Sequence, residues 1–136
     1  MTLDDLAPIY RDYIACLNAR DWENLGRFVH ADVRHNGIAL GLDGYQCMLE
    51  NDVEQIPDLF FEVRILAVTE PHVAARLWFD VAPKGEFLGL PVNGRKVGFA
   101  ENVFYAFRDD RIQEVWSIID KAAIEEQLAR VVLSER

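Results

Sequence analysis

Apolar residues recur at helical spacing in the N-terminal third of the chain and again near its C-terminus. A repeat of about 3.6 residues is typical of helices that bury one face. The pattern predicts a helix over residues 3–19, a short helix after a possible N-cap at Asp21, a helix over 42–56 that ends at Pro57, and a last helix over 121–131. Residues 32–35 are expected to be extended and to close at the Asn36-Gly37 turn.

After Pro57 the pattern changes to the alternation of β-strands. Four long strands are expected, over residues 59–69, 73–81, 96–108 and 111–120. Asp109 and Asp110 connect the last two as a hairpin, and Glu70-Pro71 forms another turn. Helices separated in sequence from an antiparallel or mixed sheet indicate an α+β fold, and 136 residues suit a single domain over 1–136.

The last predicted strand is apolar on both faces. Alternation places Val115 and Ile119 on one face and Trp116, Ile118 and Asp120 on the other. Helices on one side of the sheet cover a single face, so the second face needs another cover. A second copy of the chain is the simplest cover, and we therefore expect a homodimer that forms through the sheet.

Charge and composition exclude several classes of protein. The chain has 14 Lys and Arg against 23 Asp and Glu, a net charge of −9, without the basic stripe that nucleic-acid binding requires. No apolar run approaches the roughly 20 residues of a membrane helix, and the acidic N-terminus does not resemble a signal peptide, so a cytoplasmic location is expected. Cys16 and Cys47 lack metal-ligand spacing and are interpreted as buried free thiols, and no metal is expected.

Asp120 is the first candidate for chemistry, because a carboxylate ends an otherwise apolar strand. In a dry cavity its pKa would rise, which would suit it to acid–base catalysis near neutral pH. Alternatively, Asp120 is the N-cap of the helix that begins at Lys121. The two roles are compatible.

Further candidates share the predicted pocket. Glu101 and Asn102 have opposite orientations, so one of them faces the pocket; we favour Asn102, as a hydrogen-bond donor to an enolate oxygen, because Phe104 and two alanines share its face. His35 is either a polarising group or proton relay, or a histidine hydrogen-bonded to backbone. Four aromatic residues either contact a flat apolar substrate or pack in the core: Tyr13, Trp78, Phe104 and Trp116.

Four motifs in one order carry a family resemblance. They are His35-Asn36, Pro57-Asp58-Leu59, the loop at 87–95 (FLGLPVNGR), and the segment at 109–120 (DDRIQEVWSIID) followed by Gln127-Leu128. Together they resemble the SnoaL-like polyketide cyclases. The resemblance implies a cone-shaped fold of the nuclear-transport-factor-2-like type, with N-terminal helices packed on a curved sheet around a pocket and a short C-terminal helix.

The resemblance also implies a reaction. Asp120 matches the family's acid/base, which removes a proton from a carbon between carbonyls and returns one after intramolecular aldol closure. The substrate delocalises the charge, so no cofactor is expected, and the ligand is a small apolar or aromatic carbonyl compound. The alternative is a binding module without catalysis, in which Asp120 only caps the helix.

Overall fold

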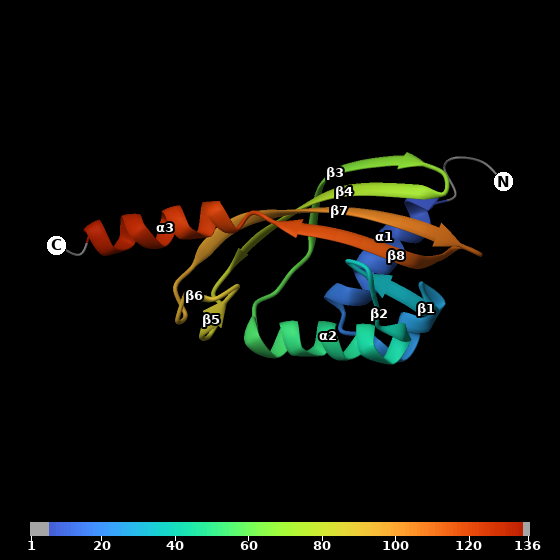
Figure 1. Ribbon diagram of the computed structural model, residues 1–136, viewed down its shortest axis with the longest axis horizontal. Coiled ribbons are helices and arrows are strands. Elements are labelled where there is room, and N and C mark those ends of the chain that lie inside the picture. Colours follow the sequence, from blue (N-terminus) through green and yellow to red (C-terminus); the bar gives the residue numbers. More distant parts are fainter. Residues whose placement is uncertain (1–5, 135–136) are drawn as a thin grey trace.

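The computed structural model of this protein describes residues 6–134, which form one curved six-stranded sheet with helices against its concave face (Figure 1). The strand order is β2-β1-β8-β7-β4-β3. The strands are β1 (Val29–His35), β2 (Ile38–Ala39), β3 (Glu62–Thr69), β4 (His72–Val81), β7 (Val97–Arg108) and β8 (Arg111–Ile119). Neighbouring strands are antiparallel except β1 and β8, which are parallel, so the predicted α+β fold with a mixed sheet is confirmed.

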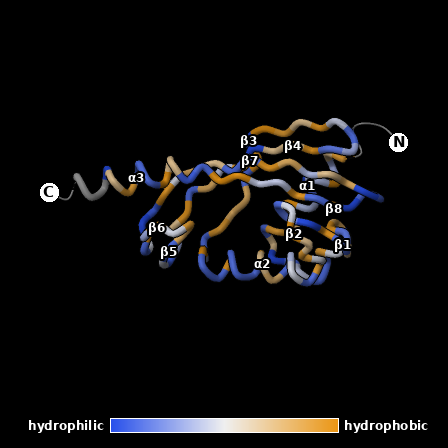
Figure 2. The backbone as a smooth tube through the Cα atoms, in the orientation of Figure 1, coloured by the Kyte–Doolittle hydropathy of each residue, from blue (hydrophilic) through white to orange (hydrophobic). Residues whose placement is uncertain are grey.

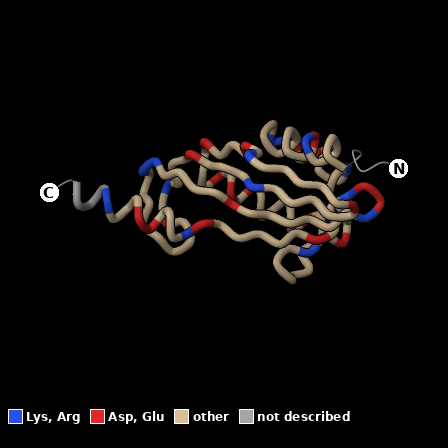
Figure 3. The backbone as a smooth tube through the Cα atoms, turned by 90° about the horizontal axis from the view of Figure 1, so that it is seen from above, with Lys and Arg blue, Asp and Glu red and all other residues tan. Residues whose placement is uncertain are grey.

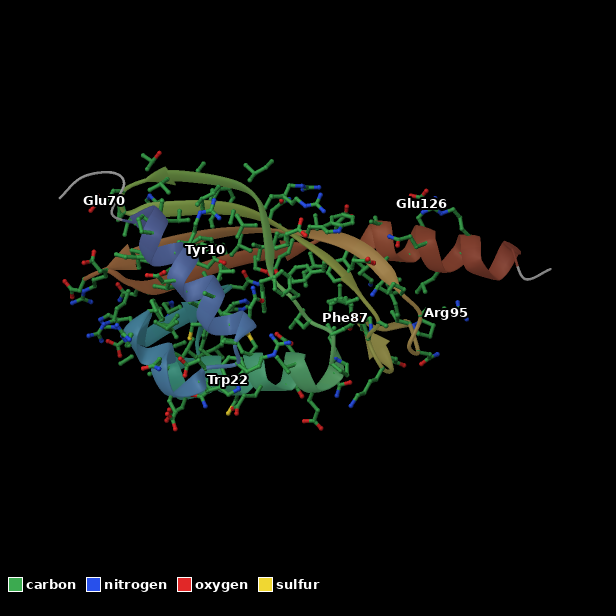
Figure 4. The ribbon with its side chains drawn as sticks, turned by 180° about the vertical axis from the view of Figure 1, so that it is seen from behind. Tyr10, Trp22, Glu70, Phe87, Arg95 and Glu126 are labelled. Carbon is green, nitrogen blue, oxygen red and sulfur yellow. The ribbon has the colours of Figure 1, made fainter. Side chains whose placement is uncertain are left out.

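Helix α1 (Leu6–Asn18) lies across the concave face, as its apolar spacing predicts. Its buried side includes Leu6, Tyr10 and Leu17. Tyr10, labelled in Figure 4, points from α1 to the sheet, and its hydroxyl lies 3.0 Å from that of Tyr105 on β7. Burying two aromatic rings together with their polar tips satisfies both hydroxyls without water.

Two further helical segments complete the cover of the concave face. The short 3-10 helix η2 (Trp22–Arg27) has Asp21 at its N-cap position, as predicted, but the Asp21 side chain makes no capping hydrogen bond to the helix backbone. Helix α2 (Gly41–Gln55) packs Tyr45 and Leu49 toward the sheet and ends before Pro57. Cys47, on the other side of α2, is exposed, which corrects the expectation that both thiols are buried.

The hairpin between β7 and β8 follows the prediction. Asp109 and Asp110 have φ values of 53° and 61°, the left-handed pair that a two-residue hairpin turn requires. The short hairpin of β5 (Glu86–Phe87) and β6 (Leu90–Pro91) lies within the segment expected to be a loop. It covers the end of the concave face beyond α2 (Figure 1).

Helix α3 (Lys121–Ser134) leaves the end of β8 and runs away from the sheet (Figure 1). Its Gln127 side chain accepts a hydrogen bond from the Gly98 backbone N–H at 2.8 Å and donates to the Gly98 carbonyl. Gly98 has no room for a side chain, because a Cβ atom there would lie 2.9 Å from the Trp78 ring. The helix is therefore tied to β7 at a position that only glycine fits.

The convex face of the sheet is apolar and uncovered by the described residues. Large side chains are exposed there to unusual extents: Ile65 by 60%, Phe104 by 58%, Trp116 by 42% and Ile118 by 74%. Figure 2 shows hydrophobic colour along parts of these strands, and in the view from above (Figure 3) charged residues lie at the strand ends and also at some positions within the strands. Within the part of the chain described, no helix is both long and apolar enough to cross a bilayer.

Candidate active site

A partly open cavity of about 230 Å³ lies between the concave face of the sheet and the helices. Its walls come from α1, β1, α2, β4, β7 and β8, and Phe87 of the β5–β6 hairpin reaches in at one end (Figure 4). A smaller hollow of about 80 Å³ shares Asp52, Phe61, Phe87 and Glu101 with it. The polar groups that face the cavity are the side chains of Tyr13, His35, Tyr45, Asp52, Glu101, Tyr105 and Ser117.

Glu101 of β7 is the most enclosed carboxyl group in this cavity. It lies opposite Ile119 of β8, and both side chains face the cavity. Removal from water raises the pKa of Glu101; the hydroxyl of Ser117, which donates to Oε2, works against this, and the nearby negative charge of Asp52 adds to it. Glu101 therefore keeps its proton to a higher pH than an exposed glutamate does.

Asp52 of α2 supplies the second carboxyl group from the opposite wall. It lies seven residues after Tyr45 and four before Ile56, on the side of the helix that faces the sheet. Burial raises its pKa to about 6. Two carboxyl groups that share an apolar cavity titrate as a coupled pair, and this arrangement suits general acid–base chemistry.

Three tyrosine hydroxyls also line the cavity, those of Tyr13, Tyr45 and Tyr105. Tyr13 and Tyr45 share a hydrogen bond of 2.7 Å, and Tyr105 pairs with Tyr10 outside the cavity wall. Burial raises the pKa of each of these tyrosines, so all four stay neutral. Neutral hydroxyls can donate a hydrogen bond to a carbonyl oxygen that gains negative charge.

His35 is placed at the cavity by the end of β1, as predicted. Its ring lies 6.3 Å from that of Tyr45, and burial lowers its pKa. The imidazole is therefore neutral at pH 7, when it can accept or donate a hydrogen bond but does not supply a positive charge.

Asp120 does not lie in the cavity, so the expectation of a carboxyl group in an apolar hollow at this position is wrong. Its side chain is exposed, on the convex side with Trp116 and Ile118. Its Oδ1 accepts a hydrogen bond of 3.2 Å from the backbone N–H of Ala123 in the first turn of α3. The helix-cap interpretation of Asp120 is confirmed.

Four other predicted site residues also face away from the cavity. Asn102, Phe104 and Trp116 share the convex face, where Asn102 accepts a hydrogen bond of 2.9 Å from Arg76. Trp78 is on the same face, beneath the guanidinium of Arg64 at 5.2 Å. Because neighbouring strand residues alternate, Glu101 faces inward where Asn102 was expected. Of the predicted aromatic contacts, Tyr13 alone lines the cavity.

The exposed cap gives a first prediction. Asp120→Ala should lower the free energy of unfolding by about 0.5–2 kcal/mol, because the first turn of α3 loses a hydrogen-bond acceptor. Asp120→Asn keeps an acceptor and should unfold close to the wild-type temperature. Thermal unfolding followed by circular dichroism measures both, and equal loss of stability in the two variants would contradict the cap.

Within residues 6–130, no three His, Cys, Asp or Glu side chains lie close enough to hold a metal ion. The site is thus a cavity with two carboxyl groups, neutral hydroxyls and a neutral imidazole, enclosed by an α+β scaffold. That combination is typical of small-molecule binding and acid–base chemistry.

Comparison with known proteins places this scaffold in a family. The family model for SnoaL-like polyketide cyclases matches residues 7–128, and the chain belongs to that family. A SnoaL-like polyketide cyclase from Agrobacterium tumefaciens is 49% identical, with a TM-score of 0.91 over 94% of this chain and 99% of that one.

More distant structures agree in fold alone. TsrD from Streptomyces laurentii is 22% identical, with a TM-score of 0.81 over 94% of this chain and 97% of that one. IdmH from Streptomyces antibioticus is also 22% identical, with a TM-score of 0.78 over 91% and 98% of the two chains. The comparison with curated proteins gave no match.

Proposed function

We propose that this protein is an acid–base enzyme, without a cofactor, that acts on a small carbonyl compound inside the cavity, with Asp52 and Glu101 as its catalytic residues. The observation that carries the proposal is the placement of two carboxyl groups with raised pKa values on opposite walls of one aromatic cavity. Membership of the SnoaL-like family supports a cyclase-like reaction. The acid–base role that sequence reasoning gave to Asp120 passes to this pair.

Aldol closure assigns each group a step. The ionised Asp52 removes a proton from the carbon between two carbonyls, and the C–H electron pair moves into an enolate. The enolate carbon attacks a ketone of the same molecule, and the new alkoxide takes the proton of Glu101. Transfer of a proton from Asp52 to Glu101 restores the starting state. Tyr13 and Tyr45 share one hydrogen bond, which leaves one of the two hydroxyls with a free O–H to donate to the enolate oxygen.

Cavity size and charge narrow the substrate. A space of about 230 Å³ fits a compound of one or two rings. Among the described residues that line it, none is Lys or Arg, so the carboxylate of an anionic substrate would meet two carboxyl groups and no cation. An uncharged compound is therefore proposed.

Exchange of carbon-bound protons tests the first step without knowledge of the natural substrate. In D₂O the protein should accelerate deuterium uptake next to the carbonyl of a two-ring ketone such as 2-tetralone, followed by proton NMR. Asp52→Asn should reduce the enzyme-dependent rate by at least about 100-fold, whereas Glu101→Gln should keep it near the wild-type value, because Glu101 acts only after the carbon–carbon bond has formed. Equal exchange with and without the wild-type protein, across a panel of one- and two-ring ketones, would count against catalysis.

The raised pKa of Asp52 also predicts a pH dependence. The exchange rate should rise as Asp52 loses its proton around its pKa of about 6, because the base must be ionised. A single rise to a plateau is expected in the profile of exchange rate against pH, and Asp52→Asn should remove the rise.

The alternative is a binding module on the same fold. The confirmed cap role of Asp120 agrees with it. Such a protein would bind 2-tetralone in the cavity, seen as chemical-shift changes, and would leave its exchange rate at the value in buffer.

We also propose that a second copy of the chain covers the convex face. Phe104 lies opposite Trp116, and Ile118 lies opposite Asn102, so the exposed apolar side chains form one continuous patch over β7 and β8. Ile65 of β3 is exposed on the same face but is separated from this patch by Arg76 and Asn102. Contiguous apolar surface of this kind marks an interface.

A further inference from the structure

An exposed asparagine at the end of β1 braces the strand that supports Glu101. Asn36 has a left-handed backbone, with φ of 48°, and its N–H donates to the Val115 carbonyl at 2.8 Å. Its side-chain amide then pairs with the backbone of Ser117: Oδ1 accepts from the N–H at 2.9 Å, and Nδ2 donates to the carbonyl at 3.3 Å. The side-chain amide of Asn36 thus makes the two hydrogen bonds to the Ser117 backbone that a continuation of β1 would make with its own backbone.

Ser117 carries this bracing into the cavity. Its side chain faces inward between Val115 and Ile119, and its hydroxyl donates to Oε2 of Glu101 on the adjacent strand β7. With Oε2 bound, Oε1 is left as the carboxyl oxygen available for exchange of a proton with a molecule in the cavity. The chain of contacts runs from the surface at Asn36, through Ser117, to one oxygen of Glu101.

We propose that Asn36 and Ser117 are positioning residues, which hold Glu101 in one orientation so that Oε1 alone donates its proton to the bound molecule. The inference rests on the proposed function, because it assigns the orientation of the proposed acid. Strand β8 itself places no carboxyl group in the cavity. Its Ser117 hydroxyl instead fixes the orientation of Glu101 on the neighbouring strand β7.

Other groups that face the cavity also affect the titration of Glu101. They are Tyr13 of α1, His35 of β1, Tyr45 and Asp52 of α2, and Tyr105 of β7. The tyrosines stay neutral, so Asp52 and His35 are the cavity groups whose charge changes while Glu101 titrates. Measurements in the Asp52→Asn background remove the Asp52 charge, and His35 is the same in the Ser117 variants and in their reference.

Carboxyl carbon NMR of protein labelled with ¹³C-glutamate tests the proposal directly, with the Glu101 signal assigned by its loss in Glu101→Gln. Ser117→Ala should raise the pKa of Glu101 by about 1, because the ionised carboxylate loses a hydrogen-bond donor. Ser117→Thr keeps a hydroxyl and should restore the pKa to within about 0.3 of wild type. A Glu101 pKa that is the same in Ser117→Ala as in wild type would overturn the proposal.

Asn36→Gly tests the outer link. Glycine accepts the left-handed backbone, so this variant removes the amide without adding strain, and the Glu101 pKa should rise by about 0.5. Asn93→Gly is the matched control, because Asn93 also has a left-handed backbone, with φ of 52°, but lies in the turn after β6. Equal effects of the two glycine substitutions on Glu101 would remove Asn36 from the proposal.

The titration of Glu101 can be measured whether or not the protein catalyses ketone exchange, so the two proposals can fail separately. If ketone exchange is absent but Ser117→Ala shifts the titration of Glu101, the proposed reaction fails and the positioning contact stands. If exchange is present and Glu101 titrates alike in wild type, Ser117→Ala and Asn36→Gly, the enzyme stands and the positioning role fails.

Discussion

Asp52→Asn should make the protein more stable above pH 6 while it abolishes ketone exchange. Burial raises the pKa of Asp52 from an ordinary 3.8 to about 6, so the folded state binds its proton more tightly than the unfolded state does. Between these two values the folded state carries more protons, and the free energy of unfolding falls as the pH rises. The contribution is largest below pH 4 and is lost above pH 6.

The size of this effect follows from the shift. A difference of about two pKa units corresponds to roughly 3 kcal/mol, which is an upper value because the neutral amide also has to be buried. We expect Asp52→Asn to gain about 1–3 kcal/mol at pH 8 and nothing at pH 4. Chemical denaturation at the two pH values measures the difference.

A control on the same helix separates this effect from a general gain. Asp43→Asn changes an exposed residue in the first turn of α2, where a negative charge is favourable, and should leave stability unchanged or slightly lower at both pH values. If Asp52→Asn destabilises the protein at pH 8, Asp52 is structural and its role as a buried base is excluded. Residues retained at a cost in stability are expected at functional sites.

Phe104→Glu should abolish the proposed dimer and leave a monomer. Its ring is 58% exposed at the centre of the convex patch, opposite Trp116, and a second copy would bury it. A carboxylate there would have to be desolvated without a partner in both copies, so we expect dimer dissociation to become at least about 100-fold easier. Sedimentation equilibrium or light scattering across protein concentrations measures it.

Ile38→Glu is the matched control for this substitution. Ile38 is 62% exposed but lies on the short edge strand β2, away from β7. The control should leave association unchanged, and both variants should keep ketone exchange, because Phe104 faces away from the cavity. A wild-type protein that is monomeric at all concentrations would remove the second copy from the convex face.

The sequence predicts which residues of a strand share a face, but it does not predict which of the two faces packs against the helices. The grouping of Val115 with Ile119, and of Trp116 with Ile118 and Asp120, matches the structure. Both groups are apolar, so hydrophobicity does not say which of them meets the helices. Sequence reasoning places Asp120 and Trp116 in the pocket on β8, and separately Asn102 with Phe104 on β7, and on both strands the structure turns the opposite face to the helices.

Asp52 was missed although the sequence carries a sign of it. Tyr45, Leu49, Asp52 and Ile56 follow each other at spacings of four, three and four, which places an acid on the apolar side of a helix. The periodicity predicts the helix from its apolar residues, and Asp52 is the one residue of this side that departs from the apolar pattern. The long strands and main helices were predictable because each has a strong repeat, whereas the β5–β6 hairpin has too few residues to show one.

Strand β7 serves two tasks that selection can alter separately. One side of β7 lines the cavity with Glu101, Val103 and Tyr105. The other side forms part of the convex face with Asn102, Phe104 and Ala106. A nucleotide change in one codon therefore alters what the protein binds inside, and a change in the next codon alters what it touches outside. Related genes can therefore change the residues that line the cavity without changing those of the convex face, and the reverse.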